Sequence, residues 1–495
     1  MDYPQRGELL NGIINGFHVI DSSQITQQVE MDNYSSVTSK QNINKVADQI
    51  KFELAHGHYK ICDNKPQIIS ALGAIPKKGS DKMRIIHDCS RPVGHAVNDF
   101  AITNSFSYQT LQDAIDLITP GCYLAKLDLC HAYRVVRLHP SNYSATGLKF
   151  TFPGDSYCTY MYDSRLPFGA KRSPEIFNSL TQAVRVMMKN KGIPGLVAYL
   201  DDFLIVTPSF DQTRDALLVL VKLLRKLGFW INYNKIEGPS QRLTFLGIIL
   251  DTNTMKLELP YSKLKDLYHE LTTLLQKSKV SKRTLQRIAG KLNWATQCVY
   301  GGRFYLRRIF DMIVSLKKPW HRIRVTSAMH ADIYWWLHYM HIFNGKTDMV
   351  DSRPVTPVYI DACNIAAGAY YEGDWIYTPW KTSWPVAANH HINFKEVMAL
   401  DPAVQRWAPL WTNRKVYVYT DNQAAAAIIN KGSCKDVITM ESLRRIFWLS
   451  AIFNFRLHAL YLPGIRNTLA DSVSRLHESK HKQFLASVGL WPPLG

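Results

Sequence analysis

The sequence predicts an α/β protein of several domains. Its 495 residues exceed the usual size of one domain, and an apolar content of 46% is enough for more than one core. Strand-like apolar runs occur up to about residue 250, helical apolar stripes follow from Pro260, and strand-like runs return near residue 358. We therefore expect an α/β part, a mainly helical part and a second α/β part.

The stretch 196–206 organises the first part. Two apolar runs flank Asp201 and Asp202, a pattern typical of a β-hairpin with acidic residues at its turn. Neighbouring strand residues point to opposite faces, so two adjacent carboxylates can serve one site only where the backbone turns. Asp is also a common turn residue, and the pair alone therefore does not indicate catalysis.

Asp128 supplies a third carboxylate at the end of the apolar run 122–129. Three converging carboxylates repel one another unless a divalent metal neutralises them, and Mg²⁺ prefers hard oxygen ligands together with substrate phosphates. Two such ions hold the attacking and leaving oxygens of a phosphoryl transfer. The three acids thus predict a polymerase-type site with two Mg²⁺, for which Mn²⁺ is an alternative.

These blocks resemble those of reverse transcriptases. Residues 199–202 (Tyr-Leu-Asp-Asp) are similar to the Tyr-x-Asp-Asp box, and Asp128 stands at the position of the first catalytic Asp. Residues 166–169 (Leu-Pro-Phe-Gly), followed by Ser-Pro at 173–174, resemble the Leu-Pro-x-Gly…Ser-Pro segment, and Phe-Leu-Gly at 245–247 resembles the primer grip. The sequences of these motifs most resemble those of gypsy-group LTR retrotransposons and tyrosine-recombinase (DIRS-type) retrotransposons.

The resemblance runs from about residue 45 to about residue 478. It implies a right-hand polymerase with fingers, palm, thumb and connection, followed by a ribonuclease H-like α/β domain. It also implies RNA- and DNA-templated DNA synthesis for retroelement replication. The implied partners are an RNA template, a DNA primer, an RNA/DNA hybrid and dNTPs.

A basic hairpin is predicted at residues 74–88, where two strand-like pieces flank a polar turn. A solvated hairpin is the plain alternative. The hairpin also resembles the fingers hairpin of reverse transcriptases, in which a Lys and an Arg close on the triphosphate. Lys77 and Arg84 match those positions, whereas we expect Lys78 and Lys82 to face solvent.

Three further residues match positions that face the nucleotide. Tyr133 stands where the family has a steric gate, a ring filling the volume that a 2′-hydroxyl would need; a core tyrosine is the alternative. Phe168 replaces the Gln of retroviral enzymes, so no hydrogen bond to the sugar is expected and packing against the nucleotide or template base remains. Lys235 resembles a Lys near the triphosphate that serves as a proton donor.

Residues 281–330 carry a concentrated positive charge, with eleven Lys and Arg against Asp311 alone. Ser281 is the expected N-cap of a helix whose apolar face is opposed by Arg283, Arg287 and Lys291. Such a stripe is usually the solvated side of a helix. With a net charge of +19, however, it indicates a polyanionic partner. We expect these three cations to bind nucleic acid in the thumb.

The primer-grip resemblance adds Leu246 and Gly247 to the expected nucleic-acid contacts. Phosphate contacts give affinity without sequence information, which suits an enzyme that slides along any template.

A second acidic centre is predicted after residue 353. Asp361, Glu396, Asp421 and Asp471 occur in order on a strand, a helix start, a strand end and a helix, an arrangement that resembles ribonuclease H. The resemblance makes all four metal ligands of a two-metal site that cuts the RNA strand of a hybrid. Residues 464–467 contain no His where many ribonucleases H carry one.

We expect five segments. They are a polar, loosely ordered N-terminal arm at 1–42, fingers and palm at 43–250, a basic thumb and connection at 251–352, the ribonuclease H-like domain at 353–478 and a tail at 479–495. Eight scattered cysteines, no secretion signal and no apolar run of membrane-span length favour an intracellular protein away from membranes.

Two rival functions remain at this point. One is a domesticated, non-catalytic nucleic-acid-binding protein, which the complete set of seven acids disfavours. The other is a polymerase that makes RNA, which Tyr133 disfavours. Protease, zinc-knuckle, integrase and recombinase signatures are not found in the sequence.

Overall fold

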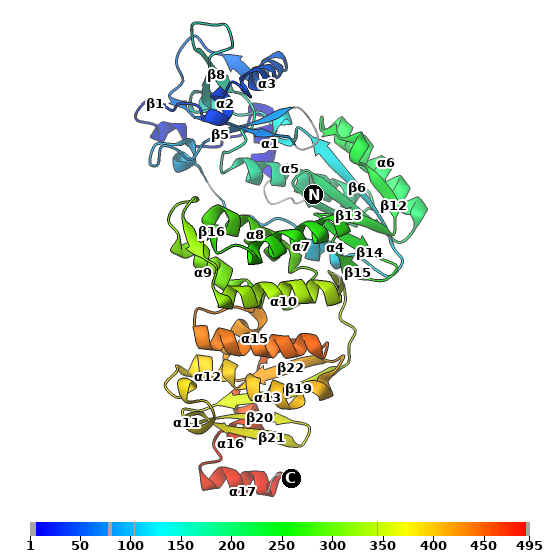
Figure 1. Ribbon diagram of the computed structural model, residues 1–495. Helices are drawn as coiled ribbons and strands as arrows, with labels where there is room; N and C mark the ends of the chain where they lie inside the picture. Colours follow the sequence, from blue (N-terminus) through cyan, green and yellow to red (C-terminus); the bar gives the residue numbers. More distant parts are fainter. Residues whose placement is uncertain (1–5, 78–81, 103, 344, 492–495) are drawn as a thin grey trace. The chain divides into compact units, whose positions relative to one another are not determined.

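The computed structural model describes residues 6–77, 82–102, 104–343 and 345–491 (Figure 1). The chain forms two compact units. The N-terminal unit comprises Met1–Leu246 and Leu250–Thr254, and the C-terminal unit comprises Gly247–Ile249 and Met255–Gly495. The boundary falls at two short strands, β13 (Arg242–Phe245) and β14 (Ile248–Asp251).

A sheet in the order β11-β6-β10-β9 forms the centre of the N-terminal unit, and β12 also pairs with β6. Its strands are β6 (Tyr123–Cys130), β9 (Leu196–Tyr199), β10 (Asp202–Thr207), β11 (Trp230–Ile231) and β12 (Glu237–Ser240). Helices α5 (Ser173–Asn190) and α6 (Phe210–Lys226) pack on it because each presents one apolar face. The Ser209 hydroxyl accepts from the Gln212 backbone N–H and begins α6.

A second sheet of the N-terminal unit has the order β1-β3-β7-β8-β2. Its strands are β1 (Val29–Glu30), β2 (Tyr59–Ile61), β3 (Ile68–Ile69), β7 (Gly147–Phe150) and β8 (Thr159–Asp163). The predicted basic hairpin is confirmed as the antiparallel pair β4 (Leu72–Pro76) and β5 (Met83–His87), with Ile75 opposite Arg84. Helix α3 (Ile43–Ala55) buries Val46 and Ile50 in the local core. The N-terminal unit also contains the short helices α2 (Ser35–Thr38) and α4 (Leu111–Ile115).

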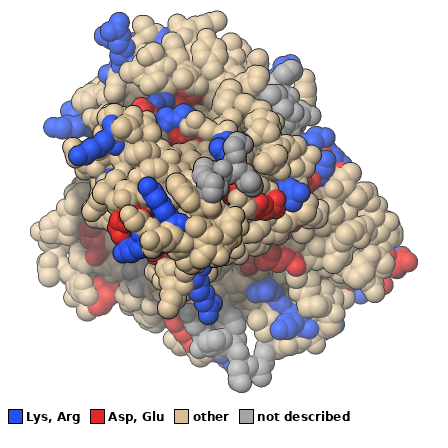
Figure 2. Space-filling view, turned by 90° about the horizontal axis from the view of Figure 1, so that it is seen from below, with Lys and Arg blue, Asp and Glu red and all other residues tan. Residues whose placement is uncertain are grey.

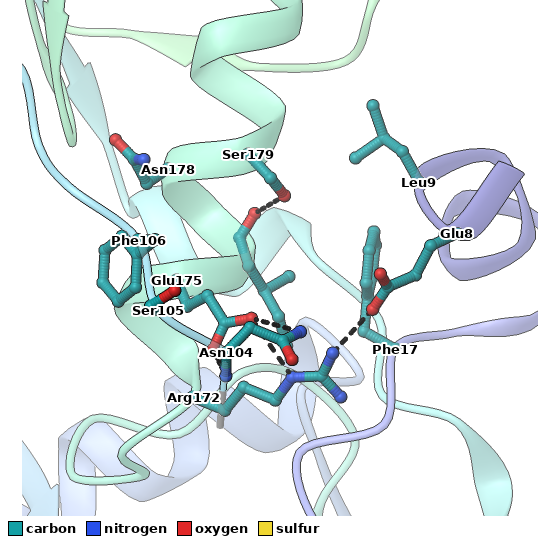
Figure 3. Close-up of a pocket in the computed structure, with 11 residues that line it drawn as sticks. Glu8, Leu9, Phe17, Asn104, Ser105, Phe106, Arg172, Glu175, Asn178 and Ser179 are labelled. Carbon is teal, nitrogen blue, oxygen red and sulfur yellow. Dashed lines mark hydrogen bonds and ion pairs between the residues drawn. The ribbon is translucent and has the colours of Figure 1, made fainter. Parts of the chain in front are cut away.

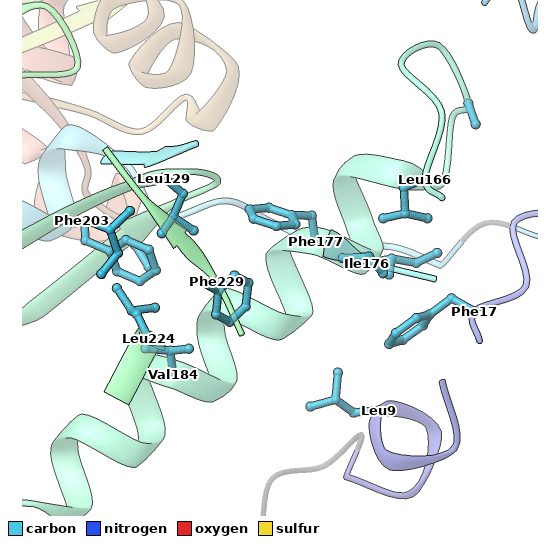
Figure 4. Close-up of a cluster of buried hydrophobic side chains, with 14 of the residues drawn as sticks. Leu9, Phe17, Leu129, Leu166, Ile176, Phe177, Val184, Phe203, Leu224 and Phe229 are labelled. Carbon is cyan, nitrogen blue, oxygen red and sulfur yellow. The ribbon is translucent and has the colours of Figure 1, made fainter. Parts of the chain in front are cut away.

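The described part of the expected N-terminal arm is folded, which differs from the loose order predicted for 1–42. Helix α1 (Arg6–Asn15) and the residues after it contribute Leu9 and Phe17 to the core around α5 (Figure 4). The polar composition of this segment gave no sign of these buried residues, because they are few and widely spaced in the sequence. Arg172 then ties the segment to α5, because its guanidinium lies 2.6 Å from Glu8 (Figure 3). It also donates to the His18 carbonyl at 2.7 Å.

The first part of the C-terminal unit is mainly helical, as predicted. Its elements are β15 (Lys256–Glu258), α7 (Tyr261–Leu275), β16 (Lys279–Ser281), α8 (Lys282–Ala295), α9 (Arg307–Ser315), β17 (Arg322–Arg324), α10 (Ser327–Phe343) and β18 (Lys346–Asp348). The expected N-cap is present, since the Ser281 side chain accepts from the Thr284 N–H. Trp335 and Trp336 on α10 are buried.

The second part is a sheet in the order β21-β20-β19-β22-β23, in which β19, β22 and β23 run parallel. Its strands are β19 (Val355–Ala362), β20 (Ala366–Tyr371), β21 (Asp374–Pro379), β22 (Lys415–Thr420) and β23 (Arg456–Tyr461). The helices are α11 (Trp380–Ser383), α12 (Ile392–Met398), α13 (Leu400–Trp407), α14 (Gln423–Lys431), α15 (Val437–Ile452), α16 (Thr468–Ser474) and α17 (Ser479–Ser487). Helix α10 meets α15 in Figure 1, and the Tyr339 hydroxyl donates to the Trp448 carbonyl.

Two other expectations about segments differ from the structure. The segment expected as a tail at 479–495 contains α17, which buries Leu485, and the Leu490 carbonyl accepts from the Trp375 indole N–H at 2.9 Å. Residues 353–357, whose prolines favour a linker before the second α/β part, are partly strand, because β19 already begins at Val355 and pairs with β22. Within the described ranges, no helix is both long and apolar enough to cross a membrane.

Candidate active sites

The first acidic site lies at the end of the β9–β10 hairpin. Asp202 is the cross-strand partner of Asp128 on β6, and the Leu129 N–H donates to the Asp201 carbonyl at 3.0 Å. Leu200 forms the turn with a φ of 52°, a left-handed conformation that is uncommon for a branched residue. The turn thus places Asp201 and Asp202 next to Asp128, as the sequence predicts.

The electrostatics of this site fit a bound divalent cation. Burial, followed by the charges of Asp201 and Asp128, raises the pKa of Asp202 to about 7. Burial also raises the pKa of Asp201, and Asp128 contributes to that increase. Carboxylates held together against their own repulsion form the donor set that Mg²⁺ and Mn²⁺ take, and a cation there would offset the repulsion.

Two residues between β11 and β12 contact Asp128. The Lys235 ammonium lies 2.7 Å from Asp128 Oδ2, and the Asn232 amide donates to the same oxygen at 3.3 Å. Hydrogen bonding to Asp128 raises the pKa of Lys235 and keeps it charged. The structure therefore places Lys235 in contact with one of the acids. Asn232 was missed, although it lies in the same short segment, because its side chain faces the acid only once β11 has paired with β6.

The expected nucleotide-facing residues lie around these acids. The Tyr133 and Phe168 rings are 5.0 Å apart, and the Arg84 guanidinium is 5.7 Å from the Phe168 ring centre. Burial, with a contribution from the charge of Asp201, raises the pKa of Tyr133, and the charge of Arg84 opposes the rise in the pKa of Asp201. Lys78 lies outside the described residues.

His131 is a neighbour of this site that sequence reasoning missed. It adopts a φ of 53° directly after β6, and its pKa is lowered by burial and by the charges of Lys77 and Lys82. Its ring stacks on Phe52 at 5.9 Å. In the sequence, the feature that could have pointed to His131 is its position three residues after Asp128.

The residues expected to contact nucleic acid lie in the segment after β13 and on helix α8. Leu246 has a φ of 47°, and a Cβ on Gly247 would lie 3.3 Å from the Trp294 ring, so the grip segment needs glycine there. Arg283 on α8 is exposed. Arg287 and Lys291 both pair with Glu270 at 2.7 Å, so this one carboxylate lowers the charge of the stripe from +3 to a net +2. On the face in Figure 2, cationic side chains stand in separate groups among acids.

The second acidic site lies at the carboxyl ends of the parallel strands β19 and β22. Carboxylate oxygens of Asp361, Glu396 and Asp421 lie within 4.8 Å of one another. Burial and then Asp361 and Asp421 raise the pKa of Glu396 to about 9, and burial raises the pKa of Asp361 to about 6. This set is again the type that divalent cations neutralise.

Asp471 lies beside this cluster but outside it. Its carboxylate pairs with Arg475 at 2.7 Å, and its charge raises the pKa values of Asp361 and Asp421. The structure therefore brings together three of the four predicted acids. Sequence reasoning missed Ser474, whose hydroxyl donates to Asp361 at 2.6 Å, since a serine one turn after Asp471 carries no signal of its own.

Residues 75–250 match the reverse transcriptase (RNA-dependent DNA polymerase) family. The enzymatic polyprotein of figwort mosaic virus is 21% identical over 77% of this chain and 54% of its own length. The Gag-Pro-Pol polyprotein of human T-cell leukemia virus 2 is 26% identical over 52% of this chain and 17% of its own length. Protein P of duck hepatitis B virus is 26% identical over 40% of this chain and 23% of its length. The chain thus spans about half the length of such relatives, or less.

Solved structures of foamy viral protease-reverse transcriptase have a similar fold. One, in complex with RNA/DNA hybrid, gives a TM-score of 0.55 at 18% identity over 90% of this chain and 56% of that chain. Another, in complex with dsDNA, gives a TM-score of 0.54 at 18% identity over 90% of this chain and 87% of that chain. The chain therefore has a right-hand polymerase fold with a C-terminal ribonuclease H-like region, and its residues 75–250 are similar in sequence to reverse transcriptases. The predicted fold class is confirmed.

Proposed function

We propose that the chain performs RNA- and DNA-templated DNA synthesis and hydrolyses the RNA strand of RNA/DNA hybrids during retroelement replication. The observation that carries this proposal is the pairing of Asp128 with Asp202 beside Asp201, within the part of the chain that matches the reverse transcriptase family. The foamy viral structures with RNA/DNA hybrid and dsDNA support nucleic-acid duplexes as partners.

Asp128, Asp201 and Asp202 would hold two Mg²⁺, with Mn²⁺ as an alternative. Bound there, the ions supply charge stabilisation and activation of the attacking oxygen. Around them, Arg84 and Lys77 would bind the triphosphate and Tyr133 would exclude a 2′-hydroxyl. Lys235 would hold a proton close to the leaving phosphate.

In the second site, Asp361, Glu396, Asp421 and Asp471 would hold the ions for hydrolysis of the RNA strand. Ser474 and the Ala362 N–H orient this set, since they hydrogen-bond to Asp361 and Glu396. The tight group of three acids supports the assignment, and Asp471 would complete the set on leaving Arg475.

We also propose the finer organisation that the sequence suggests. It has fingers and palm at 43–250, thumb and connection at 251–352 and a ribonuclease H-like domain at 353–478. The unit boundary near residue 250 supports the first of these divisions. The sequences of the motifs favour a gypsy-group LTR or DIRS-type element as the source of the chain. Leu246, Gly247, Arg283, Arg287 and Lys291 would contact the duplex.

Primer extension on poly-rA with oligo-dT tests the polymerase. We expect Mg²⁺-dependent extension by the wild type and none by Asp201→Asn, whose side chain keeps its size but loses its charge. A wild type that binds duplex without extending it would favour a non-catalytic, domesticated protein instead.

A further inference from the structure

A cavity of about 290 Å³ lies in the C-terminal unit. Its walls come from the β15–β18 pair, the end of α15 and the start of β23. Lys256, Lys346, Arg353 and Arg456 line it together with Asp348. The described lining thus holds four cationic side chains and one acid.

The cavity lies at the opposite end of the sheet from the second acidic site. Arg353 precedes β19 and Arg456 begins β23, whereas Asp361 and Asp421 lie at the carboxyl ends of the parallel strands β19 and β22. Strands of this length separate the two ends by about 20 Å. The cavity is therefore distinct from the hydrolytic site.

Arg456 is held firmly in the cavity wall. Its guanidinium lies 5.2 Å from the centre of the Tyr300 ring, and the Thr347 hydroxyl accepts one of its N–H groups. The Tyr300 hydroxyl in turn accepts from the Leu457 backbone N–H at 2.9 Å. The Nε of Arg456 is buried without a hydrogen-bond partner in the described structure, and the nearest acid oxygen, on Asp351, is 3.9 Å away.

Arg353 shares the same acid. Its Nε lies 3.3 Å from Asp351, and a terminal N–H donates to the Asn454 carbonyl at 2.9 Å. Burial and the charge of Arg456 lower the pKa of Arg353. The two guanidinium groups thus share the single carboxylate of Asp351.

The remaining charges of the cavity balance. Lys346 pairs with Glu258 at 3.1 Å, and Lys256 is the cross-strand partner of Asp348. The arginine pair therefore leaves one positive charge in excess. A buried donor without a partner and an uncompensated charge both favour an anion with several acceptor oxygens.

We propose that this cavity binds a phosphate group through Arg353 and Arg456. A phosphodiester carries one negative charge, which matches the excess, and its oxygens suit the planar fork of a guanidinium. The same chemistry has two sources: a phosphate of a nucleic-acid backbone, or a free phosphate compound. The first source rests on the proposed function, whereas the second does not.

The test uses the full chain and inorganic phosphate as the probe. At constant ionic strength, ³¹P line broadening should show saturable binding by the wild type, at least tenfold weaker binding by Arg456→Gln and weaker binding by Lys256→Gln. Arg406→Gln is the matched control, because Arg406 is an exposed arginine paired with Asp374 in the same unit. Lys256→Gln keeps the test valid if Arg456→Gln fails to fold.

A second arm identifies the source. If the site holds a backbone phosphate, Arg456→Gln should weaken binding of an RNA/DNA hybrid and lower the salt dependence by about one phosphate contact. Phosphate binding that depends on Arg456, with hybrid affinity unchanged, assigns the site to a free phosphate compound. Phosphate binding equal in all variants overturns the proposal, whether or not the chain polymerises.

Discussion

The Lys235 ammonium lies 2.7 Å from Oδ2 of Asp128, the acid that faces Asp202 across the β6–β10 pair. A residue from outside the central strands thus supplies a positive charge in direct contact with the first acidic site. The contact connects Lys235 with metal binding as well as with proton transfer, because loss of its charge would increase the repulsion among the acids.

Replacement of Lys235 should separate these two roles. Lys235→Ala is expected to lower the single-turnover rate of nucleotide addition about 100-fold, the usual range for loss of a general acid. Lys235→Arg keeps the charge but does not release a proton near neutral pH, so it should restore the Mg²⁺ requirement of the wild type without restoring the rate. A Lys235→Ala enzyme with both a normal rate and a normal Mg²⁺ requirement would exclude both roles.

Tyr133 is expected to set the preference for deoxynucleotides. Its ring packs between Phe168 and Phe177, at centroid distances of 5.0 and 5.6 Å, and is therefore fixed in position. Tyr133→Ala should raise the relative efficiency of ribonucleotide incorporation at least tenfold in primer extension, because the space for a 2′-hydroxyl opens. Tyr133→Phe keeps the ring and should discriminate like the wild type. An unchanged dNTP/rNTP preference in the Ala variant would refute the gate.

Glu396 should show a conflict between stability and activity. Its pKa of about 9 in the folded state lies above the ordinary value of 4.5, so folding takes up a proton between these pH values. Without metal, stability is therefore expected to fall as the pH rises through this window. Glu396→Gln removes the charge, and should raise the metal-free Tm at pH 8 while abolishing hydrolysis of the hybrid.

Differential scanning calorimetry in EDTA checks the stability, and each kcal/mol gained corresponds to about 2–4 °C in a unit of this size. Primer extension by the same variant should be unchanged, since Asp128 and its partners are intact. A Tm that is lower at every pH would contradict the assignment.

A buried ion-pair network predicts the acid sensitivity of the N-terminal unit. Burial raises the pKa of Glu53, but the His58 hydrogen bond and the charge of Arg134 outweigh this and lower it to about 2. The network therefore stabilises the fold fully above pH 4.5 and loses this contribution as the pH falls toward 2.

Glu53→Gln should cost about 1.5–3 kcal/mol at pH 7, because it weakens the hydrogen bonds of Glu53 with Arg134 and His58 while Asp163 still pairs with Arg134. It should also flatten the loss of stability in acid. Glu237→Gln is the matched control. It removes a half-exposed carboxylate that pairs with Lys126, so the expected cost is below about 1 kcal/mol. Urea unfolding at several pH values measures both.

The local elements were predictable from sequence because each carries its own pattern. The 196–206 hairpin has two apolar runs around a turn, and α8 has an apolar face with a capping serine, so both follow from short-range spacing. The acids were predictable because they end such elements. Their order along the chain then matched two known kinds of site.

Contacts between distant segments were not predictable in the same way. Glu270 on α7 pairs with both Arg287 and Lys291 on α8, and the Ser474 hydroxyl on α16 donates to Asp361 on β19. Such pairs depend on tertiary geometry that no local pattern encodes. Residues 6–42 illustrate the same limit, since their composition is polar although a few side chains are buried.

Phe17 tests whether that N-terminal segment belongs to the core. Its ring is buried together with Leu9 and Ile176 (Figure 4), and a Cβ on Gly12 would lie 2.3 Å from a ring carbon, so the helix and the ring fit tightly. Phe17→Ala should lower the free energy of unfolding by about 3–5 kcal/mol, the cost of a large cavity in a core.

Ile14→Ala is the control on the same segment, because Ile14 is 72% exposed and its loss should change stability by less than about 0.5 kcal/mol. If both variants unfold at the wild-type denaturant concentration, the segment does not contribute to the core. If Phe17→Ala alone is destabilised, the folded arm is a structural part of the N-terminal unit, and truncations that begin near residue 43 should lose the same stability.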